Sequence, residues 1–346
     1  MGANGHLDTV GMWDAAFAFP EQCARAADAG RDLDGLPEKD RIEHVVVLGM
    51  GGSGVAGDIL TAAAGPYMPV PVVVSKTYDL PAFVGEQSLV FAVSFSGNTE
   101  ETLEATEIAH NEGARIVAVT RGGELGAKAS AWGAPVVGVP DDIPAPRAAL
   151  GALSIPLMVV LEEIGLFPGA SNWISHAVKQ LEKRREALRG DGGIAAAVAK
   201  GIGRTVPLIY GGGGLGQVAA QRWKAQINEN VKVPAFFNTQ PELCHNEIVG
   251  WGQHGDMTRQ VFTVVDLRHG FEHPQISRRF ELVDDIIEEV VAGVEEVEAE
   301  GEGQLAQLLD LVMIGDFVSL HMAAREGLDP GPVPVIDELK KRLAGD

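Results

Sequence analysis

The chain has 346 residues, of which 46% are hydrophobic and 22% charged, and this composition predicts a globular protein of one or two domains rather than a disordered chain. Its 48 acidic and 27 basic residues give a formal net charge of −21, which disfavours binding to nucleic acid or to an anionic membrane. Two cysteines, with no CxxC pair and no HExxH motif, give no support to a disulfide framework or a zinc site. We expect a cytoplasmic protein, because two cysteines without a disulfide framework indicate a reducing compartment. Neither a run of about 20 apolar residues nor a leader with a basic and then an apolar region is visible.

The first part of the chain predicts a helical segment followed by an α/β unit. Residues 1–40 are expected to form a helical preface, since apolar residues recur at helical spacing before glycines and a proline interrupt them. The strands expected next cover residues 44–48, 70–74, 88–93, 115–119 and 135–139, and the helices among them include 55–64 and 100–112. Strands that alternate with helices predict right-handed crossovers and a parallel sheet covered on both faces.

The second part repeats this pattern after two helical stretches. The helices are expected over 148–166, 171–188, 215–228, 280–297, 304–326 and 335–343, and the strands over 206–210, 233–237 and 261–265. A strand, a glycine turn and a helix thus occur twice, which indicates an internal duplication, and paired halves often place a site between them. We divide the chain into a preface (1–40), a first α/β domain (41–150), a helical connection (151–195) and a second α/β domain with C-terminal helices (196–346).

Both glycine turns match the dinucleotide fingerprint, as Gly49-x-Gly51-x-x-Gly54 and Gly211-x-Gly213-x-x-Gly216. The match alone is weak, because an NAD site also needs an acidic residue at the end of the second strand, where this chain has Lys76. Lys76 would suit a 2′-phosphate, so an NADP-dependent oxidoreductase stays as one alternative. The other interpretation is close backbone packing between a strand and a helix, and we favour it for the second turn.

The segment Ser94-Phe-Ser96-Gly-Asn-Thr99-Glu-Glu-Thr is more informative. It lies between an expected buried strand and a helix start, and three hydroxyl side chains occur within six residues. Free N–H groups at a helix N-terminus together with hydroxyl donors form an anion cradle. One hydroxyl would indicate only an N-cap, whereas three at this spacing favour binding of a phosphomonoester.

These motifs carry a resemblance to a known family. The hydroxyl segment and Gly49-Met-Gly-Gly-Ser-Gly resemble the phosphosugar loops of sugar isomerase (SIS) domains. With Pro146-Arg-Ala-Ala, Gln226-Ile-Asn-Glu-Asn and His245-Asn-Glu, the chain from about residue 40 to the C-terminus resembles the bifunctional phosphoglucose/phosphomannose isomerase family. The resemblance implies an α/β fold of two SIS domains, each a flavodoxin-like αβα sandwich with a mostly parallel sheet. It also implies a homodimer that needs no metal or cofactor and acts on a small phosphosugar in glycolysis and gluconeogenesis.

The resemblance also implies roles for individual residues. The positions that match the family's phosphate-binding residues are Gly52, Ser53, Ser94, Ser96 and Thr99. Arg147 matches the arginine that stabilises the enediolate, and Glu229 matches the base that moves a proton between C1 and C2. His245 matches the histidine used in ring opening, which the family takes from the partner subunit. Lys340 or Lys341 matches a C-terminal lysine of the site, and we prefer Lys340 because it flanks an apolar helical stripe.

The chemistry of aldose–ketose isomerisation requires these residue types independently. One carboxylate must take a proton from one carbon and return it to the next, a cation must stabilise the enediolate, and acid and base groups must open the ring. Each residue also has a plainer interpretation. Glu229 would be a solvated helix-end acid, Arg147 would pair with Asp141 or Asp142, and Lys340 would complement a helix C-terminus.

The sequence departs from the family near its C-terminus. A threonine linked to accepting mannose 6-phosphate is expected near the Pro-Val segment, but the stretch here has Gly331 and no hydroxyl residue. This difference puts the mannose activity in doubt, and a glycine there would enlarge that corner of the pocket. The main alternative function is a phosphosugar sensor without catalysis, against which the intact base, histidine and lysine argue.

Overall fold

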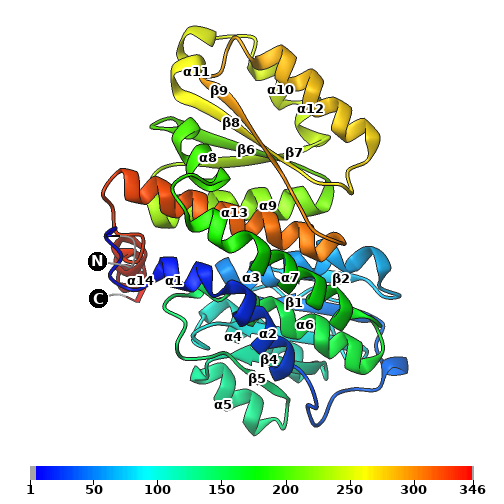
Figure 1. Cartoon of the computed structure of the whole chain (residues 1–346). Coiled ribbons are helices and arrows are strands. Elements are labelled where there is room, and N and C mark those ends of the chain that lie inside the picture. Colours follow the sequence, from blue (N-terminus) through cyan, green and yellow to red (C-terminus); the bar gives the residue numbers. More distant parts are fainter. Residues whose placement is uncertain (1–4, 345–346) are drawn as a thin grey trace.

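The computed structural model describes residues 5–344 and contains two parallel sheets with helices around them (Figure 1). The first sheet has the order β2-β1-β3-β4-β5, and the second has the order β7-β6-β8-β9. The strands of the first sheet are β1 (His44–Leu48), β2 (Val72–Ser75), β3 (Ser88–Ser94), β4 (Arg115–Thr120) and β5 (Val136–Gly138). Those of the second are β6 (Val206–Gly212), β7 (Phe236–Gln240), β8 (Phe262–Arg268) and β9 (Gly293–Glu298). Both sheets confirm the predicted α/β class.

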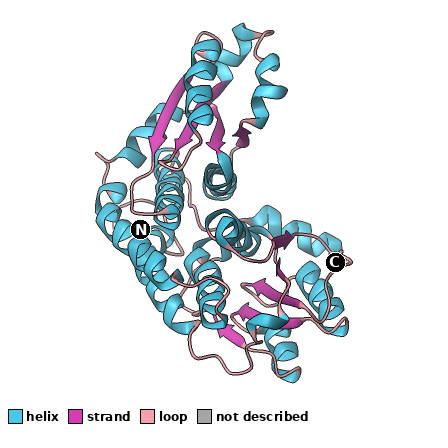
Figure 2. Ribbon diagram, turned by 90° about the vertical axis from the view of Figure 1, so that its right-hand side faces the viewer, coloured by secondary structure: helices cyan, strands magenta, loops and turns pink. Residues whose placement is uncertain are grey.

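The helices fall into an inner group between the sheets and two outer groups (Figure 2). The inner and N-terminal helices are α1 (Met12–Phe17), α2 (Phe19–Ala29), α3 (Gly51–Ala63), α6 (Leu150–Ile164), α7 (Ala170–Arg189), α8 (Ile194–Ile202), α9 (Gly213–Gln226) and α13 (Gln304–Arg325). The others are α4 (Glu100–Asn111), α5 (Gly123–Ala131), α10 (Glu247–Gly250), α11 (Gly255–Val261), α12 (Pro274–Ile287) and α14 (Pro334–Ala344). Short helical turns are η1 (Lys39–Arg41), η2 (Gly65–Tyr67), η3 (Pro146–Ala148), η4 (Ile227–Val231, a π-helix) and η5 (Glu242–His245).

One apolar core runs through the inner helical layer and joins both halves. It includes Val45 and Phe91 of the first sheet, Ile209 and Val265 of the second, and most of the length of α13. Alternate residues of the same strands face outward, where α4 and α5 cover the first sheet and α12 covers the second. By length and composition, helix α13 is apolar enough to cross a membrane. However, 94% of its most apolar stretch of 18 residues is buried inside the protein, as in a core helix.

The helix expected over residues 280–297 is wrong in its second half. Helix α12 ends at Ile287, and Gly293–Glu298 forms β9 at the edge of the second sheet, paired with β8. As an edge strand, β9 leaves Glu296 and Glu298 exposed while Val297 between them is buried. Glu296 and Glu298 therefore lie on the exposed side of the strand, whereas the neighbouring Glu295 is partly buried on the other side.

Candidate active site

Two turns meet at the carboxyl edge of the first sheet. They follow β1 and β3, which are hydrogen-bonded neighbours, so the parallel sheet brings the turns together. Ser53 in the first turn of α3 accepts a hydrogen bond from the backbone N–H of Phe95 at 3.3 Å. Gly49 permits this approach, because a β-carbon there would lie 2.9 Å from the carbonyl oxygen of Val93. The glycine turn and the hydroxyl segment are thus one surface.

The hydroxyl groups of the second turn bond to each other and to their own loop. Ser94 Oγ lies 2.9 Å from Thr99 Oγ1 and accepts from the N–H of Gly97 at 3.1 Å. Ser96 Oγ accepts from the N–H of Asn98 at 3.1 Å. Thr99 occupies the N-cap position of α4, yet its side chain makes no capping hydrogen bond. Thr99 is therefore the N-cap residue by position only, and the N-terminus of α4 keeps N–H groups that could meet an anion.

Arg147 is the buried cation next to these turns. It belongs to η3, is 4% exposed, and is surrounded by acceptors from two other segments, η4 and residues 330–331. Its Nε donates to Asn230 Oδ1 at 2.8 Å, and its Nη2 donates to the carbonyl oxygens of Pro330 and Gly331 at 2.6 and 2.7 Å. Burial lowers the pKa of the Arg147 guanidinium below its ordinary value, while the charge of Glu229 acts in the opposite direction. The planar guanidinium is thereby fixed in one orientation.

Glu229 is the carboxylate that Arg147 approaches. Its Oε2 lies 3.5 Å from Arg147 Nη1, and its side chain is 32% exposed. It lies in the π-helix η4, directly after α9, a type of turn often found at functional sites. Glu229 also borders a cavity of about 690 Å³ between the end of α9 and the start of α14. The expected pairing of Arg147 with Asp141 or Asp142 is wrong, because these acids bond to Arg121 and Arg25 respectively.

The glycine and hydroxyl turns and the Arg147–Glu229 pair lie next to one another. Gly52 lies so close to η3 that a β-carbon there would be 3.2 Å from the carbonyl oxygen of Pro146, next to Arg147. From the other side, Arg222 donates to the Arg147 carbonyl oxygen at 2.5 Å and pairs with Asp316 at 3.0 Å. The hydroxyl loop, the arginine and the carboxylate therefore lie in succession along the interface between the two halves.

Sequence reasoning missed two polar groups of this site. Asn230 is buried and bridges the two halves, since its Nδ2 donates to Ser319 Oγ at 2.9 Å while its Oδ1 accepts from Arg147. Lys232 donates from Nζ to the carbonyl oxygens of Asn230 and Asp329 at 3.0 and 2.5 Å. Burial and then the Arg147 charge lower the pKa of the Lys232 ammonium. Most of their partners are distant in sequence. The only sequence signal for these two residues was their position directly after Glu229.

The structure does not support an NADP site at the first glycine turn, because the cation expected to bind the 2′-phosphate is already paired. Lys76 is paired with Asp58 of α3 and is not free to meet a 2′-phosphate. In the second turn, a β-carbon on Gly211 would lie 2.0 Å from the carbonyl oxygen of Gly216, so backbone contact explains these glycines. Among residues 5–344, no group of three His, Cys, Asp or Glu side chains is placed to hold a metal ion.

Comparison with known proteins identifies the family. A model described as "SIS domain" matches residues 40–131, and one described as "Bacterial phospho-glucose isomerase C-terminal SIS domain" matches residues 193–343. The bifunctional phosphoglucose/phosphomannose isomerase of Caldicellulosiruptor bescii is 37% identical over 96% of this chain and 99% of its own length. That of Aquifex aeolicus is 34% identical over 86% of this chain and 90% of its own. This chain belongs to the bifunctional phosphoglucose/phosphomannose isomerase family.

A solved structure also supports the fold. The C-terminal domain of glucosamine-fructose-6-phosphate aminotransferase from Francisella tularensis superposes with a TM-score of 0.69, covering 96% of this chain and all of that domain (100%) at 15% identity. This confirms the predicted double SIS architecture, in which two related α/β halves share an inner helical layer.

Two of the site residues expected from the family make no hydrogen bond or ion pair with the Arg147–Glu229 pair among residues 5–344. His245 ends the turn η5 and is exposed, and Lys340 lies on the exposed helix α14. The single chain therefore places the hydroxyl turns, Arg147 and Glu229 next to one another, whereas His245 and Lys340 are not bonded to Arg147 or Glu229 within residues 5–344.

The enlarged corner expected at Gly331 is not present. A β-carbon on Gly331 would lie 2.4 Å from Val10 Cγ2, so a side chain of the N-terminal preface already fills that space. The preface is held there by Thr9, whose Oγ1 donates to Asp329 Oδ2 at 2.5 Å. This chain has no hydroxyl residue at position 331, and the apolar side chain of Val10, from another segment, occupies the adjacent space.

Proposed function

We propose that this protein interconverts glucose 6-phosphate and fructose 6-phosphate, and that it also accepts mannose 6-phosphate. The observation that carries the proposal is the contact between Arg147 Nη1 and Glu229, next to the hydroxyl turns of the first sheet. Family membership supports the same reaction, since the relatives are named for it. The chemistry calls for a carboxylate, cations and a histidine, all of which the chain supplies.

The geometry suggests how these residues act. The substrate phosphate is held by Ser53, by Ser94, Ser96 and Thr99, and by the N–H groups at the start of α4. Glu229 takes the proton from C2 of the aldose and returns it to C1, through a cis-enediolate. In Arg147, Nε and Nη2 already donate to protein oxygens, which leaves Nη1, beside Glu229, to stabilise the enediolate oxygens.

Ring opening requires His245 and Lys340 to reach the substrate, and we propose that a second copy of the chain provides the histidine. Helix α14 supports this assembly, because Val335, Leu339 and Leu343 are 79%, 57% and 79% exposed on a helix that carries Lys340. Such an exposed apolar face suits an interface between subunits. We further propose a cytoplasmic role in glycolysis and gluconeogenesis, in keeping with two free cysteines.

A coupled assay tests the activity. Purified, chelator-treated protein is supplied with fructose 6-phosphate, and glucose 6-phosphate and mannose 6-phosphate are scored separately. Formation of both products is expected. Formation of glucose 6-phosphate alone would remove the mannose activity, and binding of phosphosugars without any turnover would favour the sensor.

Mixing two inactive variants tests the shared site. Glu229→Gln and His245→Asn are expected to be inactive singly and to regain activity when their subunits are mixed and allowed to exchange. In a mixed dimer with the histidine contributed by the partner, one of the two sites holds both native residues. If Glu229 and His245 act within one chain, no mixed dimer has an intact site and no activity returns.

A further inference from the structure

A second cavity, of about 610 Å³, lies between the two halves and is not part of the site described above. Its walls come from the C-terminal half of α3, from the turn after β6 and from the turn after β8, with Asp58, Tyr67, Gly213, Gln217, Phe271 and His273 among the lining residues. The volume is in the range of small-molecule sites, and the carboxyl edge of a parallel sheet is where α/β proteins bind ligands.

This cavity is the counterpart of the active site in the duplicated fold. Helices α3 and α9 pack against each other in opposite directions, since Gly214 at the start of α9 lies beside Ala62 near the end of α3. Helix α3 begins at the phosphate turns and ends at the cavity, whereas α9 begins at the cavity and ends at Glu229. Tyr67 follows Gly51 at the same separation as Glu229 follows Gly213.

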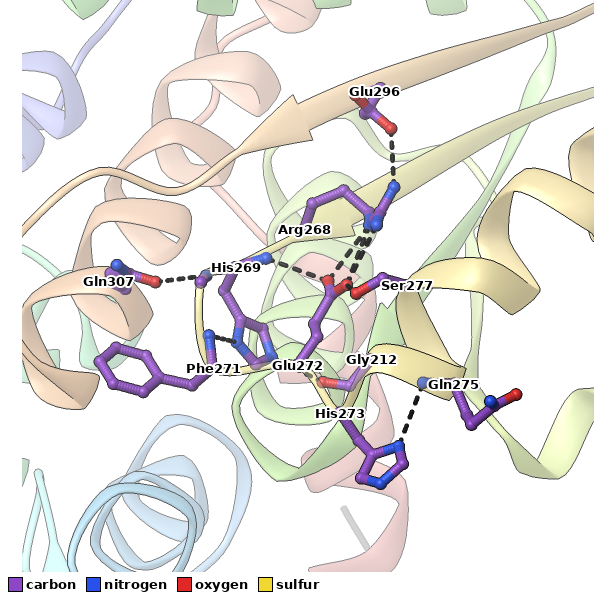
Figure 3. Close-up of polar contacts among 11 residues, drawn as sticks. Gly212, Arg268, His269, Phe271, Glu272, His273, Gln275, Ser277, Glu296 and Gln307 are labelled. Carbon is purple, nitrogen blue, oxygen red and sulfur yellow. Dashed lines mark hydrogen bonds and ion pairs between the residues drawn. The ribbon is translucent and has the colours of Figure 1, made fainter.

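The side chains at the equivalent positions do not form a phosphate site. The turn after β8 leads into α12 as the turn after β3 leads into α4, and at matching places it has Arg268 for Ser94 and His273 for Thr99. Arg268 donates to Glu272 at 3.1 Å and to Glu296 at 2.9 Å, so two carboxylates already neutralise its charge (Figure 3). Near the other wall, Lys76 is held by Asp58. Among residues 5–344, no lysine or arginine lines the cavity itself, and these two nearby cations each have a carboxylate partner.

The histidines of the turn after β8 are engaged by backbone groups of their own surroundings. His269 has both ring nitrogens occupied, since Nε2 lies 2.8 Å from the Gly212 carbonyl oxygen and Nδ1 accepts from the N–H of Phe271 at 3.2 Å (Figure 3). Burial lowers the pKa of His269, which keeps the ring uncharged. His273 Nδ1 accepts from the N–H of Gln275 at 3.1 Å and caps α12. His269 therefore has no ring nitrogen left for a ligand, and Nδ1 of His273 is already engaged.

The remaining lining groups match an uncharged polyol. Tyr67 and Phe271 are 54% and 44% exposed, and their ring faces suit the C–H face of a sugar. The amides of Gln217, Gln221 and Gln304 both donate and accept, which is what hydroxyl groups require. Gln304 also donates to the Tyr67 hydroxyl and so links α13 to the first half of the chain across the cavity rim.

We propose that this cavity is a second, non-catalytic site that binds an uncharged hexose, with Phe271 and Tyr67 against the ring and glutamine amides on the hydroxyl groups. The juxtaposition of aromatic faces and amides in a cavity without a free cation selects the unphosphorylated sugar. The phosphosugar stays at the hydroxyl turns of the first sheet. The duplicated fold would thus have two locations that bind sugar, of which only one is catalytic.

Saturation-transfer difference NMR on the full-length protein tests the proposal with D-glucose and D-fructose as probes. The spectra are recorded with and without saturating glucitol 6-phosphate, which has no carbonyl group and cannot be isomerised. Signals of the neutral hexoses are expected to persist when glucitol 6-phosphate is present. Because the readout is binding, it is independent of whether the protein turns over any sugar phosphate.

Variants locate the signal. Phe271→Ala and Gln217→Ala are each expected to weaken hexose binding, Phe271→Ala by about tenfold. Phe83→Ala is the matched control, since Phe83 is also 44% exposed but does not line the cavity, and it should bind as the wild type does. Gln217 is exposed on α9, so its alanine variant keeps the fold even if Phe271→Ala does not.

Four outcomes would overturn the proposal. The first is the absence of signal from either hexose, and the second is loss of that signal on addition of glucitol 6-phosphate, which would place the hexose in the active site. The third is equal binding by the wild type, Phe271→Ala and Gln217→Ala. Tighter binding of a hexose phosphate than of the hexose at the Phe271 site would contradict the assignment to an uncharged ligand.

Discussion

The ammonium of Lys232 donates to the backbone carbonyl of Asp329 at 2.5 Å, and this bond ties the end of the Glu229-bearing helix to the segment that leads into α14. The next two carbonyls, of Pro330 and Gly331, accept from Arg147. Two cations of the site thus hold three consecutive carbonyl oxygens, and the conformation of residues 329–331 depends on both.

Replacing Lys232 by methionine should loosen this segment. Lys232→Met keeps the length of the side chain but leaves the carbonyls of Asn230 and Asp329 without their charged donor, and we expect a fall in kcat of roughly tenfold, from about 1.5 kcal/mol of lost positioning. Lys224→Met is the control, because Lys224 lies on α9 and makes no ion pair within residues 5–344. Steady-state kinetics distinguish the two, and wild-type kcat in Lys232→Met would show that the tie has no part in positioning.

Removing the charge of Glu229 should stop proton transfer. Glu229→Gln preserves shape and is expected to lower kcat by ~10²–10⁴-fold, the usual loss for an essential base. Glu112→Gln, at the exposed C-terminal end of α4, should retain wild-type activity. The coupled assay with fructose 6-phosphate measures both, and more than about a tenth of the wild-type rate in Glu229→Gln would exclude this residue as the base.

The contact between Val10 and Gly331 predicts a dependence between two substitutions. Gly331→Thr alone should lower the free energy of unfolding by about 1–3 kcal/mol, because its β-carbon collides with Val10. Combining it with Val10→Ala should restore most of that stability and raise the share of mannose 6-phosphate formed. Urea denaturation and product analysis measure the two effects. Additive losses in the double variant would show that Val10 is not the obstacle.

The second sheet contains a buried acidic pair whose protonation should affect stability. Asp266 of β8 is fully buried with both carboxylate oxygens lacking partners among the described residues, and burial and the charge of Asp284 raise its pKa well above the ordinary value. The folded protein therefore holds a proton that the unfolded chain releases. This contribution is complete below the ordinary pKa and is lost as pH rises through the raised one.

Asp266→Asn tests this sign. The variant has no charge to bury, so it should be more stable than the wild type at pH 8, by on the order of 1 kcal/mol or more, and the difference should shrink as pH falls towards 5. Asp285→Asn, on the exposed side of α12, should change little. Urea unfolding from pH 5 to pH 9 gives the comparison, and a constant difference across that range would contradict a raised pKa.

Local patterns were sufficient for much of the fold and part of the site. Strands β1, β3, β4 and β6 could be predicted because each is a short β-branched run before a glycine or hydroxyl turn. Edge strand β9 could not, since Val294-Glu-Glu-Val-Glu298 lacks the strict apolar–polar alternation that signals a strand, and it pairs with one neighbour. Its identity depends on β8, which is not encoded within the segment itself.

By itself, the sequence determined the hydroxyl turn, because Ser94, Ser96 and Thr99 lie within six residues and their arrangement follows from one strand, one turn and one helix start. Only the tertiary structure decided what surrounds the chemistry. Arg147 meets Asn230 and the carbonyls of Pro330 and Gly331 across 83 to 184 positions of sequence. Val10 fills the space beside Gly331 from the opposite end of the chain. Short-range motifs encode the hydrogen bonds of a turn, whereas burial of an arginine requires acceptors that only the packing of distant segments brings together.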